Sequence, residues 1–160
     1  MNHPAQQRIA PAAIRKTIEV RAPIERAFDV FANRIGEWWH KEHCLSKGTP
    51  LVDVVIEPRA GGRWYEKGGD GSEQEWGRVI AWEPPQRLVL AWQLNREFQY
   101  DPDFETTIEV RFEERGGTTV VSFEHRDLER MGEGAVETLE QMDGGWGMLL
   151  DLYRAAAERG

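Results

Sequence analysis

His125 is the residue of this sequence best suited to acid–base chemistry. It ends a run, residues 119–125, in which apolar and polar side chains alternate, so its imidazole shares a face with Val121 and Phe123. An imidazole titrates near neutral pH and can donate a hydrogen bond or move a proton. A histidine at a strand end is more often a hydrogen-bonded structural residue, and we favour that interpretation over catalysis.

Other reactive side chains give weaker signals. His40, His43 and Cys44 carry imidazole and thiolate groups, which are zinc ligands, but a fourth ligand at a conventional spacing is missing. We therefore predict a solvated loop and no metal. Arg78 shares strand parity with Trp76, so it either orients a ligand from inside a cavity or lies on the solvent face. No serine stands in a nucleophile-elbow pattern, which argues against nucleophilic hydrolysis.

Tryptophan is the most informative residue type here. The chain contains seven, and four of them fall between residues 57 and 92 in short strand-like runs separated by glycine and proline. Tryptophan has a large apolar surface and a single N–H donor. So many in one sheet indicate either a bulky core or a cavity with aromatic walls.

Hydrophobic periodicity predicts the elements that must position these side chains. Apolar residues at i, i+3, i+4 and i+7 predict a first helix after Pro23, and a long C-terminal helix is interrupted by Gly144 and Gly145. Each glycine in a helix interior lowers helix stability by about 1 kcal/mol relative to alanine, so we expect a close approach of another backbone or a kink there. The predicted strands are residues 14–20, 51–56, 63–67, 75–82, 87–94, 106–113 and 119–125, and the predicted helices are 24–31, 35–39 and 134–158.

Composition limits the possible partners. A formal charge of −8 and a pI near 5.1 argue against nucleic acid, which rewards a concentrated basic face. One cysteine suits a reducing compartment, and no apolar run reaches the length of a membrane span. We expect a flexible leader at residues 1–13, one domain over 14–160, a cytoplasmic location, no cofactor, and a monomer or homodimer.

The order of elements predicts an α+β fold, a curved antiparallel sheet around the last helix. The chain resembles the START-like, SRPBCC superfamily with the helix-grip fold, and within it the family named for homology to the activator of heat-shock protein 90 ATPase. The resemblance lies in APIERAFDVF (22–31), EWW (37–39), EPRAGGRWYE (57–66), GRVIAWEPPQRLVLAW (77–92), EHRDLE (124–129) and GGWGMLLDLY (144–153). The separate chaperone-binding domain of eukaryotic co-chaperones is not expected here.

The resemblance implies a deep cavity between the sheet and the long helix, used in the superfamily for apolar molecules. A register slip of one residue would move Trp64 or Trp76 to the opposite face, and any single tryptophan is as readily a core residue as a ligand contact. We expect binding of a small apolar molecule, aromatic, polyketide-like or lipid-like. The alternatives are a cyclase or aromatase, in which His125 acts, and a chaperone-associated or other protein-interaction module. The predicted ligand-binding residues are Trp38, Trp39, Trp64, Trp76, Trp92, Phe112, Phe123, His125, Trp146, Leu150 and Tyr153.

Overall fold

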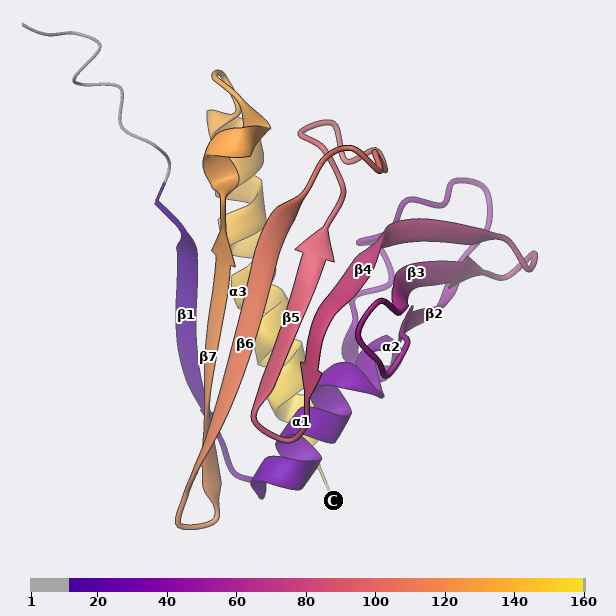
Figure 1. The fold of residues 1–160 in the computed structure, drawn as a ribbon. Helices are drawn as coiled ribbons and strands as arrows, with labels where there is room; N and C mark the ends of the chain where they lie inside the picture. The colour runs from indigo at the N-terminus through magenta and orange to yellow at the C-terminus, as the bar shows by residue number, and fades with distance from the viewer. Residues whose placement is uncertain (1–11, 160) are drawn as a thin grey trace, which may run out of the picture.

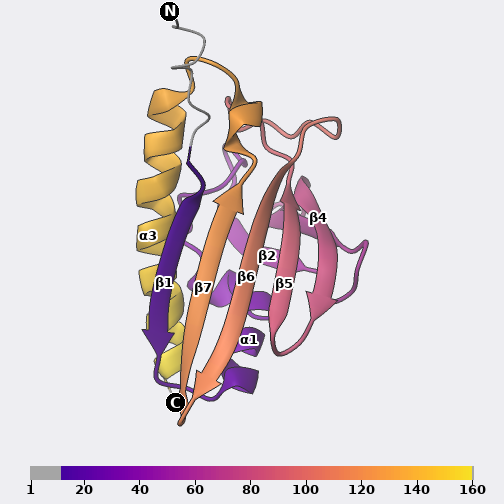
Figure 2. The same cartoon turned by 60° about the vertical axis from the view of Figure 1, so that its left-hand side comes forward.

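A single antiparallel sheet of seven strands forms the frame of the protein. The computed structural model describes residues 12–159, and the strand order across the sheet is β1-β7-β6-β5-β4-β3-β2. The sheet curls, and a long helix lies along its inner side (Figures 1 and 2). The strands are β1 (Ile14–Val20), β2 (Leu51–Ile56), β3 (Arg63–Gly68), β4 (Glu73–Glu83), β5 (Arg87–Trp92), β6 (Thr106–Arg115) and β7 (Thr118–Arg126).

Three α-helices complete the fold: α1 (Ile24–Ala32), α2 (Ile35–Trp38) and α3 (Val136–Glu158), with a 3-10 turn, η2 (Leu128–Met131), before α3. The predicted α+β helix-grip fold is confirmed, and every predicted strand and helix is present. The turn at η2 has no counterpart among the predicted elements. Alternation decides the inner face of the long strands, where Ile108, Val110 and Phe112 of β6 are buried beside Val121 and Phe123 of β7.

The C-terminal half of α3 is held firmly against α1. The guanidinium of Arg26 donates to the carbonyl oxygens of Ala157 (2.7 Å) and Ala156 (3.2 Å), which have no partner within the helix end. The hydroxyl of Tyr153 donates to the carbonyl of Ala27 at 2.7 Å. These bonds place the end of α3 over the short helices and leave its first half to face β4, β5 and their loops.

The glycines of α3 do not lie at a close backbone approach, although their unfavourable helix propensity predicted one. The helix runs unbroken through residues 144–147, and a Cβ at Gly144 would meet nothing within 4 Å. A Cβ at Gly145 would meet only the ring of His43, at 3.6 Å, and one at Gly147 only the Lys16 ammonium, at 3.8 Å. The close-approach expectation was therefore wrong, and these glycines leave open space instead.

Two irregularities in β4 decide the faces of its side chains. The pairing of β3 with β4 shifts at Trp64 and Tyr65, so that Trp76 is an extra residue in β4, and the pairing with β5 shifts between Val79 and Ala81. A bulge of this kind lets residues two apart in the chain point to different faces. Trp76 is thus buried, whereas Arg78 is exposed and forms an ion pair with Glu105 at 2.6 Å.

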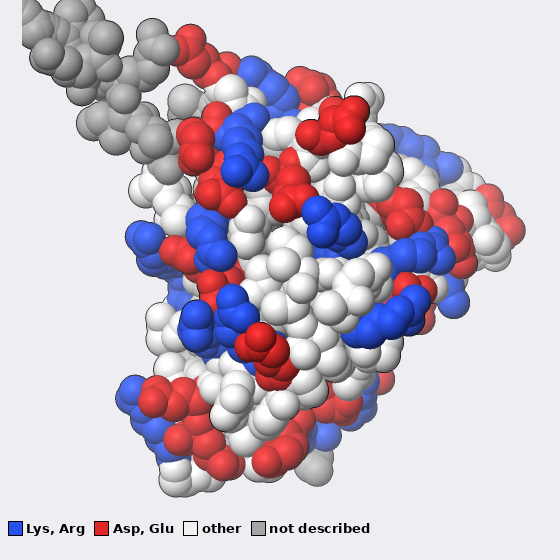
Figure 3. Space-filling model, in the orientation of Figure 1, with Lys and Arg blue, Asp and Glu red and all other residues white. Residues whose placement is uncertain are grey.

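The outer face of the sheet carries mixed charge. Figure 3 shows acidic and basic side chains interspersed over it, around an uncharged centre. Glu109 alone pairs with three arginines, Arg87, Arg111 and Arg126, at 2.6–2.8 Å. This face therefore offers no concentrated basic patch of the kind that nucleic acid rewards. No helix within residues 12–159 has both the length and the apolarity needed to cross a membrane. Residues 1–11 of the predicted leader lie outside the described residues.

The close pairing of β4 with β5 requires a glycine directly after the bulge at Trp76. A Cβ at Gly77 would lie 1.8 Å from the carbonyl oxygen of Ala91 on β5, so Gly77→Ala should destabilise the protein by about 1–3 kcal/mol or more. Gly144→Ala is the matched control, because the same methyl enters open space in a helix and should stabilise by up to about 1 kcal/mol. Urea denaturation of both variants tests this, and equal effects of the two substitutions would contradict it.

Candidate functional site

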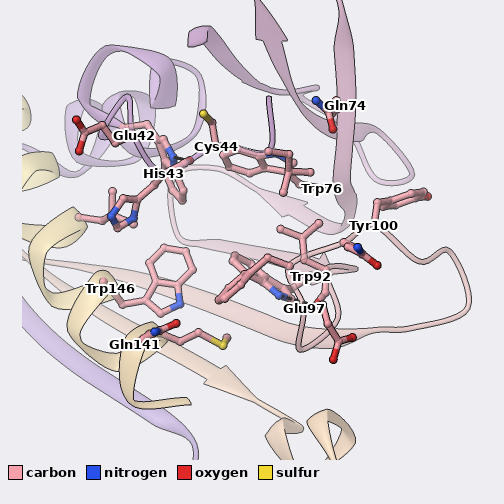
Figure 4. A pocket seen from close by; sticks show the side chains of 18 of the residues that line it. Glu42, His43, Cys44, Gln74, Trp76, Trp92, Glu97, Tyr100, Gln141 and Trp146 are labelled. Atoms are coloured by element: carbon pink, nitrogen blue, oxygen red, sulfur yellow. Dashed lines mark hydrogen bonds between the residues drawn. The ribbon is translucent and has the colours of Figure 1, made fainter. Parts of the chain in front are cut away.

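A pocket of about 1270 Å³ opens between the first half of α3 and the β4–β5 side of the sheet. Two loops border it, one from α2 to β2 and the other from β5 to β6. Figure 4 shows indole rings from the sheet and from α3 around its interior, with amide and carboxylate groups towards its rim. The side chains that line it include Trp39, His43, Cys44, Gln74, Trp76, Trp92, Leu94, Phe98, Tyr100, Gln141, Met142, Trp146, Met148 and Leu149.

Four of the lining tryptophans touch one another. The ring centroid of Trp39 lies 4.9 Å from that of Trp76 and 5.8 Å from that of Trp146, and Trp146 lies 5.8 Å from Trp92. These separations fall within the range of favourable aromatic contacts. The four rings come from the segment after α2, from β4, from β5 and from α3, so a continuous aromatic wall joins elements far apart in the sequence.

The wall is tied to the neighbouring loop by Glu66 of β3, a fully buried residue. One carboxylate oxygen accepts hydrogen bonds from the indole N–H of Trp76 (2.7 Å) and the backbone N–H of Leu45 (2.6 Å). The other accepts from the backbone N–H and the hydroxyl of Ser46, at 3.0 and 2.6 Å. A buried carboxylate is tolerated when its lone pairs are satisfied in this way. Glu66 therefore fixes the loop at residues 45–46 to the aromatic wall.

His125 lies in the core beneath this wall and does not line the pocket. Its Nδ1 accepts the indole N–H of Trp146 at 3.2 Å, so Nε2 carries the proton and donates to the Thr106 hydroxyl at 2.8 Å. Burial lowers the pKa of His125 to about 3, an effect that Asp127 partly opposes. Both nitrogens are occupied and the ring stays neutral, which supports the structural interpretation: His125 orients Trp146.

His43 and Cys44 do line the pocket, whereas His40 does not. Among residues 12–159, no three His, Cys, Asp or Glu side chains gather closely enough to hold a metal ion. Burial raises the pKa of the Cys44 thiol, and Glu66 raises it further, so the thiol stays protonated at neutral pH. A protonated thiol is a poor nucleophile, so Cys44 acts here as a small wall residue.

The predicted ligand-binding residues fall into two groups. Trp39, Trp76, Trp92 and Trp146 line the pocket, and whether they bind a ligand is a proposal taken up below. The remainder are buried in the core and do not line it: Trp38, Trp64, Phe112, Phe123, His125, Leu150 and Tyr153. On α3 the pocket is lined by Met142, Trp146 and Leu149. Leu149, and not the predicted Leu150 that follows it, therefore faces the pocket. Trp64 stacks edge-on with Trp76 and Trp92, and its buried N–H has no partner among residues 12–159.

The loop between β5 and β6 was not among the predicted parts of the site. Leu94, Phe98 and Tyr100 line the pocket from this loop. The side-chain oxygen of Asn95 accepts the N–H groups of Glu97 and Gln99, both at 3.0 Å, and so folds the loop back on itself. Phe98 has φ of 57°, the left-handed region that non-glycine residues seldom occupy. The available signal was an asparagine, Asn95, three residues before the aromatic pair Phe98 and Tyr100.

The chain matches the family described as "Activator of Hsp90 ATPase homolog 1-like protein" over residues 21–158. The protein belongs to this family. The predicted resemblance is thereby confirmed, and the match extends from the end of β1 to the end of α3. A comparison with curated protein sequences found no match.

Solved structures agree with this assignment. The chain is 34% identical to the anthrahydroquino-γ-pyrone synthase Txn09, solved as a complex with SUM; the similarity covers 89% of this chain and 97% of that one, with a TM-score of 0.62. It is 32% identical to CalC from Micromonospora echinospora, described as a self-sacrificing resistance protein, over 91% and 93% of the two chains, with a TM-score of 0.68. The Aha1 dimer from Colwellia psychrerythraea is 16% identical over 94% and 98%, with a TM-score of 0.65, and shows the fold alone.

The role of Glu66 predicts a measurable effect on the loop. Glu66→Gln replaces one acceptor oxygen by an N–H₂ group that faces N–H donors, so the free energy of unfolding should fall by about 1–3 kcal/mol. Hydrogen exchange of the Leu45 and Ser46 amides should accelerate. Glu73→Gln makes the same chemical change at a half-exposed ion pair with Arg63, and its effect should stay below about 1 kcal/mol. Unchanged protection of the two amides in Glu66→Gln would contradict this role.

The low pKa of His125 predicts acid sensitivity. The unfolded chain binds a proton on this residue near pH 6.5, and the folded protein does so only near 3, so stability is fully present above pH 6.5 and declines towards pH 3. Between pH 7 and pH 5 the titration of this residue should lower the free energy of unfolding by about 2 kcal/mol. Urea denaturation at both pH values should show that loss in the wild-type protein and its absence in His125→Asn. An equal loss in both proteins would assign the acid sensitivity to other groups.

Proposed function

We propose that this protein binds a small apolar molecule with a planar, polyketide-like aromatic ring system in the pocket beside α3. The observation that carries the proposal is the contiguous wall of Trp39, Trp76, Trp92 and Trp146 around a space of about 1270 Å³. Such a wall matches the flat faces of fused rings, and ligand sites are typically apolar clefts with a few polar groups. Gln74, Gln141 and Tyr100 supply polar groups at the rim.

The names of the similar structures support this ligand class. Txn09 is called a synthase of an anthrahydroquino-γ-pyrone, which is a fused-ring aromatic compound, and it shares 34% identity with this chain. A cyclase-type reaction in the same pocket is the second candidate, favoured by that name and by an imidazole, His43, among the lining residues. We place this function in the cytoplasm, in a monomer or homodimer with one domain over residues 14–160.

Calorimetric titration with a hydroxyanthraquinone tests the binding proposal. The wild-type protein should bind it, and Trp92→Leu should weaken binding about tenfold, because it removes one aromatic face and about 1.4 kcal/mol of contact. Trp82→Leu is the matched control, since Trp82 packs against Phe28 at 5.1 Å and does not line the pocket. Absence of binding across a panel of anthraquinones, flavonoids and fatty acids would overturn the proposal, as would equal affinities of the two variants.

A further inference from the structure

His43 has a position set by its backbone. It lies in the loop between α2 and β2, where its N–H donates to the carbonyl of His40 at 3.0 Å. Its carbonyl accepts the indole N–H of Trp39 at 2.7 Å. Neither bond uses the imidazole. The ring is therefore presented to the pocket by contacts that a side-chain substitution would leave in place.

The imidazole of His43 has no hydrogen-bond partner among residues 12–159, and it lines the pocket from a solvent-exposed position. One edge of the ring lies over α3, where a Cβ on Gly145 would be 3.6 Å from Cε1 and 4.0 Å from Nδ1. A methyl group at position 145 would make ordinary van der Waals contact with the ring. In contrast to His125, whose two nitrogens are both bonded within the core, His43 keeps a nitrogen lone pair free.

The surroundings of His43 keep its ring neutral at pH 7. Partial desolvation beside the pocket lowers the pKa of His43, the nearby His40 lowers it further, and Glu42 opposes both effects. Other charged groups line the pocket from the elements packed around it: Glu75 of β4, Glu97 of the β5–β6 loop, Glu140 of α3 and Lys47 of its own loop. A neutral imidazole titrating somewhat below its usual range is a suitable base for reactions near neutral pH.

We propose that His43 is the general base of this pocket and acts on a carbon acid, an aromatic compound bearing a C–H group between two carbonyls. This inference rests on the proposed function and names the chemistry of the same site. The imidazole lone pair takes the proton, and the C–H electron pair becomes an enolate. The enolate carbon then forms a C–C bond to another carbonyl carbon of the same molecule, and the resulting alkoxide recovers the proton from the imidazolium. The product is an isomer of the substrate, so no oxidant, reductant or cofactor is consumed.

Nitrobenzisoxazole is a probe that reports such a base without the natural substrate. A base removes its ring C–H proton, the N–O bond breaks to give a nitrile, and a coloured phenolate leaves with the electron pair. The wild-type protein should accelerate this elimination, and His43→Gln should be at least about tenfold slower. Lys41→Gln, in the same loop but away from the pocket lining, should retain the wild-type rate. Added imidazole should restore part of the rate to His43→Ala, which a merely structural role would not produce.

The pH profile gives an independent readout. The rate should rise with pH and level off, with a midpoint below the usual pKa of histidine, and His40→Gln should move that midpoint upward because it removes a neighbouring positive charge. Binding of the hydroxyanthraquinone, together with equal elimination rates in wild type and His43→Gln, would overturn the assignment of the base and leave the binding function standing. Failure of the hydroxyanthraquinone and of the rest of the panel to bind would overturn the two proposals together.

Discussion

The buried carboxylate of Glu66 is the interaction on which the pocket depends. Burying a charge costs several kcal/mol, and here four neutral donors offset that cost without an opposing cation among the bonds it makes. Because the donors come from β4 and from the loop after α2, the two sides of the pocket are joined through one residue of β3. The loop that carries His43 and Cys44 thus takes its position from the sheet, and the site is a product of the fold and not of the loop alone.

Hydrogen bonds of the indoles extend this rigidity around the wall. Trp39 donates to the carbonyl of His43, Trp92 to that of Leu94, and Trp146 to the ring of His125. Each ring is therefore fixed in its plane as well as packed against its neighbours, so the wall exists before any ligand arrives. A preformed apolar wall loses little conformational entropy on binding, which favours flat and rigid ligands over flexible chains.

The sequence predicted the fold well because long alternating strands and one long amphipathic helix leave little choice of arrangement. It predicted the site less well, since periodicity identifies the face of a residue but not its depth. His125 and Phe123 were correctly assigned to the inner face, yet both lie beneath Trp146. The ring centroids of Phe123 and Trp146 are 4.5 Å apart. The bulge at Trp76 and the fold of the loop after β5 depend on local hydrogen bonds and close contacts that no pattern of apolar residues encodes.

The two halves of helix α3 have different roles: the C-terminal half packs in the core, and the first half lines the pocket. Its C-terminal half carries Tyr153 and the carbonyls bonded by Arg26, so it serves the stability of the core. Its first half carries Gly144 and Gly145 beside the pocket, where alanine would favour the helix and its methyl group would meet open space at position 144 and the ring of His43, in ordinary van der Waals contact, at position 145. The part of the helix that touches the pocket is thus the part with the lower intrinsic helix propensity.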